Sequence, residues 1–281
     1  MPLSTTGELV AHAVADGRGV AAFNVITLEH AEAIALGAER AGTAAILQLS
    51  ENAIKFRGGD LSAIAAATAE VAHASSAPLS LHLDHVTDTA LLRAAHAGGF
   101  SSVMFDASKL SHAANVEATA DAARWAHEHG IWIEAELGEV GGKDGAAPLD
   151  AHSPGARTDP TEAAAYVTAT GVDALAVAVG SSHAMTQRTA VLDHALIRSL
   201  RDAVPVPLVL HGSSGVPDTE IRAALASGMT KINVGTALNA AFTGEVRGHL
   251  AADPDVVDPR KYLTPAREAM AGVVESFLRL V

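Results

Sequence analysis

The segment of residues 79–97, LSLHLDHVTDTALLRAAHA, joins a strand-like run to a helical pattern. Residues 79–83 form a short run bounded by Pro78 and Asp84, which is typical of a strand. Residues 89–97 are rich in alanine and leucine and have the length of a short helix. A strand followed by a helix is the building unit of parallel α/β proteins.

The same unit recurs along the whole chain. Strand-like runs occupy residues 20–25, 44–49, 79–83, 102–105, 131–137, 174–179, 207–210 and 230–234. Most of them are too apolar for a sheet that exposes one face to solvent. Helical patterns alternate with them at 28–41, 61–74, 89–97, 113–129, 161–168, 192–202, 218–226 and 237–250, and a further amphipathic helix is predicted at 265–280. Thr27, and Asp159 before Pro160, are the clearest helix-capping signals.

The number of repeats predicts the fold. Eight strand-then-helix repeats in 281 residues favour a (β/α)8 TIM barrel of the α/β class with an additional C-terminal helix. We expect residues 1–281 to form a single TIM-barrel domain. No G-x-G-x-x-G motif opens a helix after the first run, which disfavours an open dinucleotide-binding sheet.

Composition narrows the class of protein. Hydrophobic residues make up 49% and charged residues 18% of the chain, which is sufficient for a large core. The formal net charge of −13 predicts no nucleic-acid partner and no anionic membrane surface as partner. The start of the chain lacks a signal-peptide pattern, and no apolar run reaches the roughly 18 residues of a membrane helix, so a cytoplasmic protein is expected. Without cysteine, any metal must be bound by His, Asp or Glu.

Polar residues gather where the predicted strands end, which is where barrels build their active sites. His85, His183 and His211 follow the third, sixth and seventh runs, so a closed barrel would bring them together. Three imidazoles leave a zinc ion one open position, as catalytic sites do. The chain has 14 histidines, so ordinary surface or core positions for these three are the alternative.

Asp84 and His85 pose a geometric problem. Neighbours in a strand point to opposite faces, so both reach one site only if the chain turns there. The alternative is that Asp84 caps the helix that follows.

Two Gly-rich loops follow the last two runs. One contains Gly212, Ser213 and Ser214, and the other spans residues 233–236. Barrels often bind phosphate at these two places, where glycine permits close approach and backbone amides meet the oxygens. A third segment, residues 138–157, has no periodicity and is long for a barrel loop, which is typical of functional lids.

Eight short motifs can be compared with known families. In chain order they are AFNV at 22–25, LHLDH at 81–85, SVMFDAS at 102–108, EAELG at 134–138, AVAVGSSH at 176–183, HGSSGVP at 211–217, KINVGT at 231–236 and PRKY at 259–262. This set resembles the class II fructose-bisphosphate and tagatose-bisphosphate aldolase family. The resemblance covers nearly the whole chain in the family's order.

The resemblance implies an aldolase that reversibly cleaves a phosphorylated ketose, either a ketose 1,6-bisphosphate or a ketose 1-phosphate. The products would be a ketone of the dihydroxyacetone-phosphate type and an aldehyde. It further implies that His85, His183 and His211 bind a catalytic Zn²⁺. Asp84 would move the proton of the hydroxyl group at the cleaved bond, which is general acid–base catalysis.

Other positions are implied by the same resemblance. Asp106 and Glu136 match acids that hold a second or displaced divalent metal, and Asp144 matches an acid of the family's mobile loop that exchanges the proton of the enediolate. The implied substrate and phosphate site consists of Asn24, Ser50, Gly212, Ser213, Ser214, Asn233, Val234, Gly235 and Thr236. In this family the loop backbone also holds a monovalent cation, Na⁺ or K⁺, and the chains assemble as homodimers or homotetramers.

The sequence departs from the family pattern after His183. Ala184 stands where the family has glycine, and Gln187 replaces a lysine that helps to bind phosphate. Arg188 is the nearest cation that could substitute for it. A specialised aldolase for a modified or singly phosphorylated sugar is therefore an alternative.

Three other readings compete with a zinc aldolase. An imine-forming aldolase would use Lys231, whose alternative role is an ion pair inside the barrel end. A metal-dependent hydrolase would use a bound water but leaves the phosphate-type loops without a purpose. A non-catalytic family member or partner subunit would keep the barrel and bind zinc without turnover.

Overall fold

The computed structural model describes residues 3–137 and 157–281 and contains a closed barrel of eight parallel strands. The strands are β1 Val20–Asn24, β2 Ala45–Ser50, β3 Leu79–Val86, β4 Ser102–Phe105, β5 Trp132–Leu137, β6 Ala174–Val177, β7 Leu208–Leu210 and β8 Met229–Val234. Each strand pairs with the next one, and β1 pairs with β8 to close the ring. The predicted (β/α)8 barrel is confirmed.

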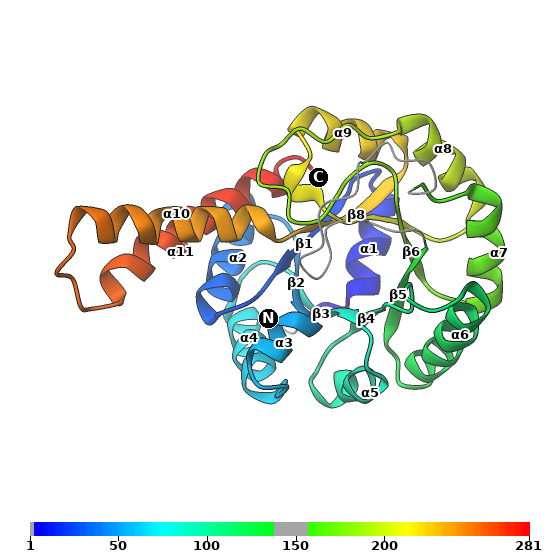
Figure 1. The fold of residues 1–281 in the computed structure, drawn as a ribbon, viewed down its shortest axis with the longest axis horizontal. Helices are drawn as coiled ribbons and strands as arrows, with labels where there is room; N and C mark the ends of the chain where they lie inside the picture. The colour runs from blue at the N-terminus through cyan, green and yellow to red at the C-terminus, as the bar shows by residue number, and fades with distance from the viewer. Residues whose placement is uncertain (1–2, 138–156) are drawn as a thin grey trace.

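Helices surround the barrel on its outer side (Figure 1). They are α2 Leu28–Ala41, α4 Ser62–Ala74, α5 Thr89–Ala97, α6 His112–Glu128, α7 Pro160–Thr170, α8 His194–Ala203, α9 Asp218–Ser227 and α10 Thr236–Ala252. The additional C-terminal helix, α11 Arg260–Leu278, lies along α10 and packs on α2. Both capping signals are confirmed: Thr27 precedes α2, and the Asp159 carboxylate accepts from the backbone amides at the start of α7. None of the helices in the described ranges has the length and apolar character to cross a membrane.

Two helices were not predicted. The first, α1 Thr6–Ala15, begins with a capping box in which Thr5 and Glu8 satisfy each other's backbone amides. Its Leu9 and Val10 pack against Val20 at the start of β1, so this helix covers the amino end of the barrel. The second is the short α3 Glu51–Phe56, which Ser50 caps at the end of β2.

The start of the last helix was predicted incorrectly. The sequence pattern predicts Pro265 as its first position, but α11 begins at Arg260 and Pro265 lies inside it. The amino end of the helix follows Pro259, and the Asp258 carboxylate accepts from the Arg260 amide at 3.0 Å, which satisfies one of the free amides of the first turn.

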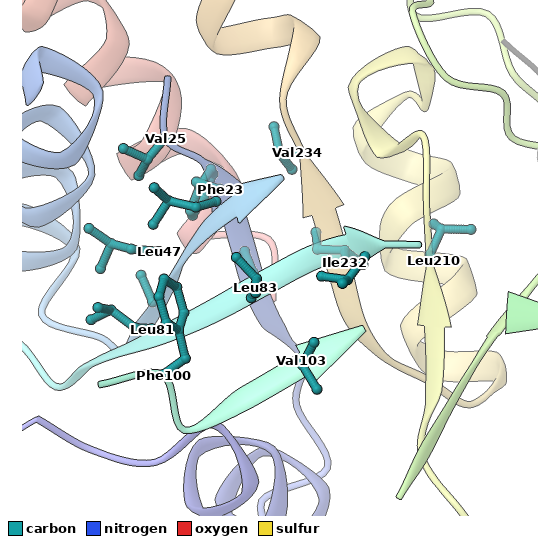
Figure 2. Close-up of a cluster of buried hydrophobic side chains, with 14 of the residues drawn as sticks. Phe23, Val25, Leu47, Leu81, Leu83, Phe100, Val103, Leu210, Ile232 and Val234 are labelled. Atoms are coloured by element: carbon teal, nitrogen blue, oxygen red, sulfur yellow. The ribbon is translucent and has the colours of Figure 1, made fainter. Parts of the chain in front are cut away.

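The two faces of the strands differ in chemistry. On β3, Leu81 and Leu83 join the apolar layer between the barrel and its helices, as Figure 2 shows. The alternate residues His82 and Asp84 point into the barrel, where they are buried. Glu134 of β5 and Lys231 of β8 also meet there at 2.8 Å. The barrel interior therefore holds buried polar side chains beside small apolar clusters that include Ile46 and Val209.

The contact between α2 and α11 depends on Gly37. A Cβ atom at this position would lie 2.6 Å from Val274 Cβ and 2.8 Å from the Ala271 carbonyl oxygen. We expect Gly37→Ala to lower the free energy of unfolding by about 1–3 kcal/mol, because the two helices must separate. Urea denaturation measures the change. The control Gly244→Ala on α10, where an added Cβ meets no atom within 4 Å, should be neutral or stabilising. Equal stabilities for both variants would contradict the tight contact.

Candidate active site at the carboxyl end of the barrel

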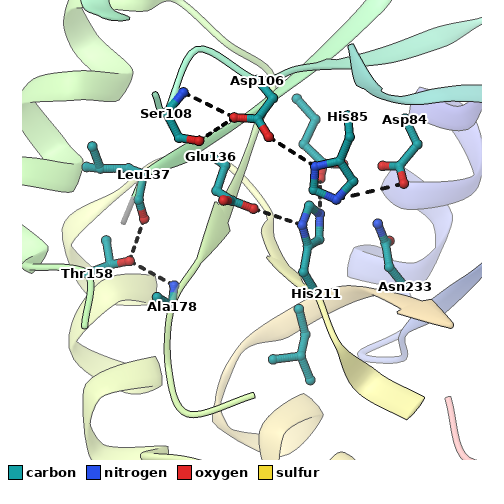
Figure 3. Close-up of polar contacts among 12 residues, drawn as sticks. Asp84, His85, Asp106, Ser108, Glu136, Leu137, Thr158, Ala178, His211 and Asn233 are labelled. Carbon is teal, nitrogen blue, oxygen red and sulfur yellow. Dashed lines mark hydrogen bonds and ion pairs between the residues drawn. The ribbon is translucent and has the colours of Figure 1, made fainter. Parts of the chain in front are cut away.

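The three predicted histidines come together. The ring centroids lie 5.2 Å apart for His85 and His183, 4.8 Å for His85 and His211, and 5.7 Å for His183 and His211. Glu136 joins them from β5, and one donor atom from each of the four side chains lies within 4.8 Å of all the others. Figure 3 shows Glu136, His85 and His211 directed at a common point. This geometry, in which donors from β3, β5 and the segments after β6 and β7 face one place, is that of a site able to hold a metal ion.

The turn that Asp84 and His85 require is present in β3. His85 has a positive φ of 51°, and the pairing register between β3 and β4 shifts between Leu83 and Val86. Both side chains consequently face the site, with Asp84 Oδ2 4.0 Å from His85 Nε2. The alternative role of Asp84 as a helix cap is wrong, because Asp88 caps α5 by accepting from the Ala90 amide at 2.8 Å.

A close backbone contact places His183 beside His211. Gly212 has a φ of 69°, and a Cβ there would lie 2.5 Å from the Ser182 carbonyl oxygen and 3.1 Å from its amide nitrogen. Only glycine permits this approach between the loops after β6 and β7. Ala184, on the other side of His183, also has a positive φ of 59°, a conformation that the glycine of the family pattern adopts without strain.

His211 is held at both ring nitrogens by carboxylates. Its Nε2 lies 2.9 Å from Glu134 Oε1 and its Nδ1 lies 3.0 Å from Glu136 Oε2, and all three side chains are fully buried. Burial opposes the charged ring, yet hydrogen bonds to Glu134 and Glu136 raise the pKa of His211 to about 9. Burial would raise the pKa of Glu134, but Lys231 and His211 hold it at about 2, so this carboxylate is ionised.

Asp84 is an ionised carboxylate in the wall of a cavity. Burial opposes its charge, but His85 and the neighbouring His82 and His211 lower its pKa below the ordinary value. Gln48 Nε2 lies 3.4 Å from its Oδ2, while its Oδ1 has no hydrogen-bond partner among the described residues. Such a carboxylate can accept a proton from a bound ligand.

Asp106 lies behind His85 and is not one of the four converging groups. Its Oδ2 is 3.2 Å from His85 Nδ1, while the Ser108 amide and hydroxyl donate to its Oδ1 at 3.1 and 2.5 Å. It therefore orients the His85 ring in this structure. Asp144 lies outside the described residues, as does most of the predicted lid segment.

Two adjoining cavities open at the histidine cluster. The smaller has a volume of about 140 Å³ and the larger about 440 Å³, and Asn24, His85, His183, Ala184 and Thr236 line both. Ser50 lines the larger cavity, and Gly212, Ser214, Asn233 and Gly235 line the smaller one.

The predicted substrate residues do not all face these cavities. The side chains of Ser213 and Val234 line neither of them: Ser213 Oγ donates to the Leu210 carbonyl oxygen at 3.0 Å, and Val234 lies in the core. The Ser214 hydroxyl accepts from the backbone amides of Gly235 and Ala237 at 3.3 and 3.1 Å. It thus joins the two Gly-rich loops.

The cation nearest to Gln187 is directed away from the site. Arg188 donates to the Val216 carbonyl oxygen at 2.8 and 2.6 Å, pairs with Asp218 at 2.5 Å and lies over the Phe277 ring. It therefore does not substitute for the lysine of the family pattern. Among the described residues that line the smaller cavity there is neither lysine nor arginine.

Several buried polar residues that contact the site have no role predicted from the sequence. Gln48, His82 and Glu134 contact Asp84 or His211 from inside the barrel. The signal for them is a polar residue within an otherwise apolar strand. Lys231, by contrast, forms the ion pair with Glu134 that was the alternative to imine chemistry, and it lines neither cavity.

A closed parallel barrel with a histidine and carboxylate cluster at the carboxyl ends of its strands defines the class: a TIM-barrel enzyme with a candidate metal site. The family model "Fructose-bisphosphate aldolase class-II" matches residues 4–281. The chain belongs to the class-II fructose-bisphosphate aldolase family, and it is accordingly an aldolase, a carbon–carbon lyase.

Individual relatives agree with this assignment. The chain is 37% identical over 281 residues to a fructose-bisphosphate aldolase of Geobacillus stearothermophilus, covering 99% of this chain and 96% of that protein. It is 38% identical over 282 residues to a probable fructose-bisphosphate aldolase of Bacillus subtilis (strain 168), covering 99% and 97%. Among solved structures, the YdjI aldolase of Escherichia coli K12 superposes with a TM-score of 0.82 at 27% identity, covering 99% of this chain and 96% of that one. A putative fructose-1,6-biphosphate aldolase of Coccidioides immitis gives 0.84 at 27% identity, covering 98% and 95%.

Proposed function

We propose that this protein is a zinc-dependent aldolase that reversibly cleaves a ketose 1,6-bisphosphate or ketose 1-phosphate. The products are a ketone of the dihydroxyacetone-phosphate type and an aldehyde. The observation that carries the proposal is the convergence of His85, His183 and His211 beside the ionised Asp84, at the junction of two cavities.

The residues present fit a divalent metal. The donors are imidazole nitrogens and carboxylate oxygens, which suit zinc in a chain without cysteine. Among the described residues, the carboxylates of Asp84, Asp106, Glu134 and Glu136 lie around these donors, and Glu134 is paired with the Lys231 ammonium, so the site favours a bound cation. We assign His85, His183 and His211 as the zinc ligands, with Glu136 and Asp106 available to a second or displaced divalent ion. Bound zinc would supply Lewis acidity that withdraws negative charge from the ketone end of the substrate.

The side chains around this cluster supply the remaining chemistry. Asp84 acts as the general base that removes the hydroxyl proton during cleavage and returns it during condensation. Asn24, Ser50, Gly212, Ser214, Asn233, Gly235 and Thr236 hold the sugar phosphate, and the backbone at Ser213 and Val234 completes the same loops. Those loops are also the proposed place of a monovalent cation. Asp144 is proposed to exchange the proton of the ketone product.

Aldehyde release from ketose phosphates tests the proposed function. We expect turnover that a chelator abolishes and added Zn²⁺ restores, because the Lewis acid is removed and returned. Borohydride with substrate should leave the activity intact, because no imine forms. Borohydride inactivation that persists in the presence of chelator would instead support an imine on Lys231. Zinc binding without turnover of any ketose phosphate would support a non-catalytic subunit.

A specialised substrate is the second candidate. It is favoured by the smaller cavity, whose described lining has no cationic side chain, and by Arg188, which binds elsewhere. A phosphate in this cavity would depend on backbone amides and hydroxyl groups. A screen across ketose monophosphates and bisphosphates distinguishes the candidates: a general aldolase prefers the bisphosphate, whereas a specialised one prefers a monophosphate or modified sugar.

Three further predictions concern the cellular location, the oligomeric state and the domain boundaries. A location in the cytoplasm and assembly as a homodimer or homotetramer stay predictions, as does the extent of the single domain over residues 1–281. Cell fractionation, light scattering and limited proteolysis check them in turn.

A further inference from the structure

Lys231 places a fully buried ammonium group inside the barrel. It lies on β8 two residues before Asn233, so both side chains point into the interior. Its Nζ donates to Glu134 Oε2 and to Asn233 Oδ1, both at 2.8 Å. An ammonium group has hydrogen-bond donors and no acceptor, so each partner must turn an acceptor oxygen toward it.

The orientation of the Asn233 amide follows from this contact. Because Lys231 can only donate, Asn233 must present its Oδ1 to the ammonium and turn its Nδ2 to the opposite side. That Nδ2 is buried and has no hydrogen-bond partner among the described residues. Asn233 lines the smaller cavity with Asp84 and His85, and Figure 3 shows its amide nitrogen directed toward them. Leaving a buried donor unpaired costs free energy. We therefore expect Asn233 Nδ2 to donate a hydrogen bond to a bound ligand.

The orientation of the His211 ring depends on the same ammonium through Glu134. Lys231 occupies Glu134 Oε2, and the other oxygen, Oε1, lies 2.9 Å from His211 Nε2. A carboxylate oxygen only accepts, so His211 donates from Nε2 and turns Nδ1 toward Glu136 and the histidine cluster. Carboxylates that bind the second nitrogen of a histidine in this way orient metal ligands.

We propose that Lys231 is a positioning residue for the aldol reaction. It aims the Asn233 amide donor at an oxygen of the substrate and, through Glu134, holds the His211 ring for the metal ion. The inference rests on the proposed function. Since Lys231 lines neither cavity, it acts only through these two partners.

The first experiment isolates the effect on Asn233. Combining Lys231→Met with Glu134→Gln removes one buried charge of each sign, so the net charge of the interior does not change, and the amide oxygen at position 134 still accepts from His211. We expect kcat to fall about 10²-fold, as for the loss of one aligned donor, with a smaller change in KM. Asn233→Ala alone should show the same loss, and adding it to the double variant should cause no further loss. Lys261→Met, at an exposed lysine on α11, is the matched control and should behave as the wild type.

The second experiment measures zinc affinity by chelator competition and needs no turnover. Lys231→Met alone leaves Glu134 without its ammonium, and we expect zinc to bind about 10–100-fold more weakly. The double variant, Lys231→Met with Glu134→Gln, should recover most of that affinity. If the single variant does not fold, the measurements on the double variant are used instead. A merely structural role would lower stability without producing this recovery.

Three results would overturn the proposal. They are wild-type kcat in the double variant, a further full loss when Asn233→Ala is added to it, and unchanged zinc affinity in a folded Lys231→Met protein. If the wild type cleaves no ketose phosphate, the proposed function fails, whereas the zinc affinities still decide whether Lys231 positions His211.

Discussion

Replacing His211 with alanine is expected to abolish zinc binding and aldol turnover together. The ring is fully buried and held at both nitrogens, so no other side chain can take its place in the cluster. Lewis-acid stabilisation of the developing charge is worth several kcal/mol, and a loss of about 4 kcal/mol lowers kcat about 10³-fold. The variant also leaves Glu134 and Glu136 without the ring between them, so its free energy of unfolding should fall.

Metal analysis of the purified His211→Ala protein, together with aldehyde release, measures both effects. His12→Ala is the matched control, because His12 is exposed on α1 near the opposite end of the barrel. It should bind zinc and turn over substrate as the wild type does. A His211→Ala protein that is folded, retains zinc and remains active would remove His211 from the metal site.

Replacing Asp84 with alanine is expected to leave zinc bound while turnover falls about 10²–10⁴-fold, which is the usual contribution of a general acid–base group. Asp84 is buried in the cavity wall and ionised, and its Oδ1 has no hydrogen-bond partner among the described residues, so this oxygen is available to accept the hydroxyl proton. It is not one of the four groups whose donor atoms converge, so the metal ligands remain in place.

The Asp84→Ala experiment separates loss of chemistry from loss of metal. Zinc content and aldehyde release are measured on the same preparation, with Asp88→Asn as the control. Asp88 caps α5 just beyond the site, and asparagine caps helices equally well, so this variant should retain full activity. Turnover close to the wild-type rate in Asp84→Ala would exclude Asp84 as the base.

Local patterns in the sequence were sufficient for the order of the elements. Apolar runs of strand length alternate with helical patterns, and this alternation predicted all eight strands of the barrel. The positions of His85, His183 and His211 after their strands predicted that they would meet, because parallel strands present their carboxyl ends on one side. The helix α1 was not predicted, although Thr5 and Glu8 form a capping-box pattern in the sequence. For α11, Pro265 suggests a helix start, but the helix begins at Arg260, directly after Pro259.

Other features arise only when distant segments meet. The ion pair between Glu134 and Lys231 and the contact of Gly212 with Ser182 join residues from different strands and loops. Neither spacing nor composition predicts which carboxylate a buried histidine or lysine will face, because that choice depends on closure of the barrel. The primary structure therefore specified which groups stand at the strand ends, and the closed barrel decided which nitrogen, oxygen or amide each of them turns toward the site. The physical reason is that periodicity is a local property, whereas the partner of a buried charge is selected by packing across the whole interior.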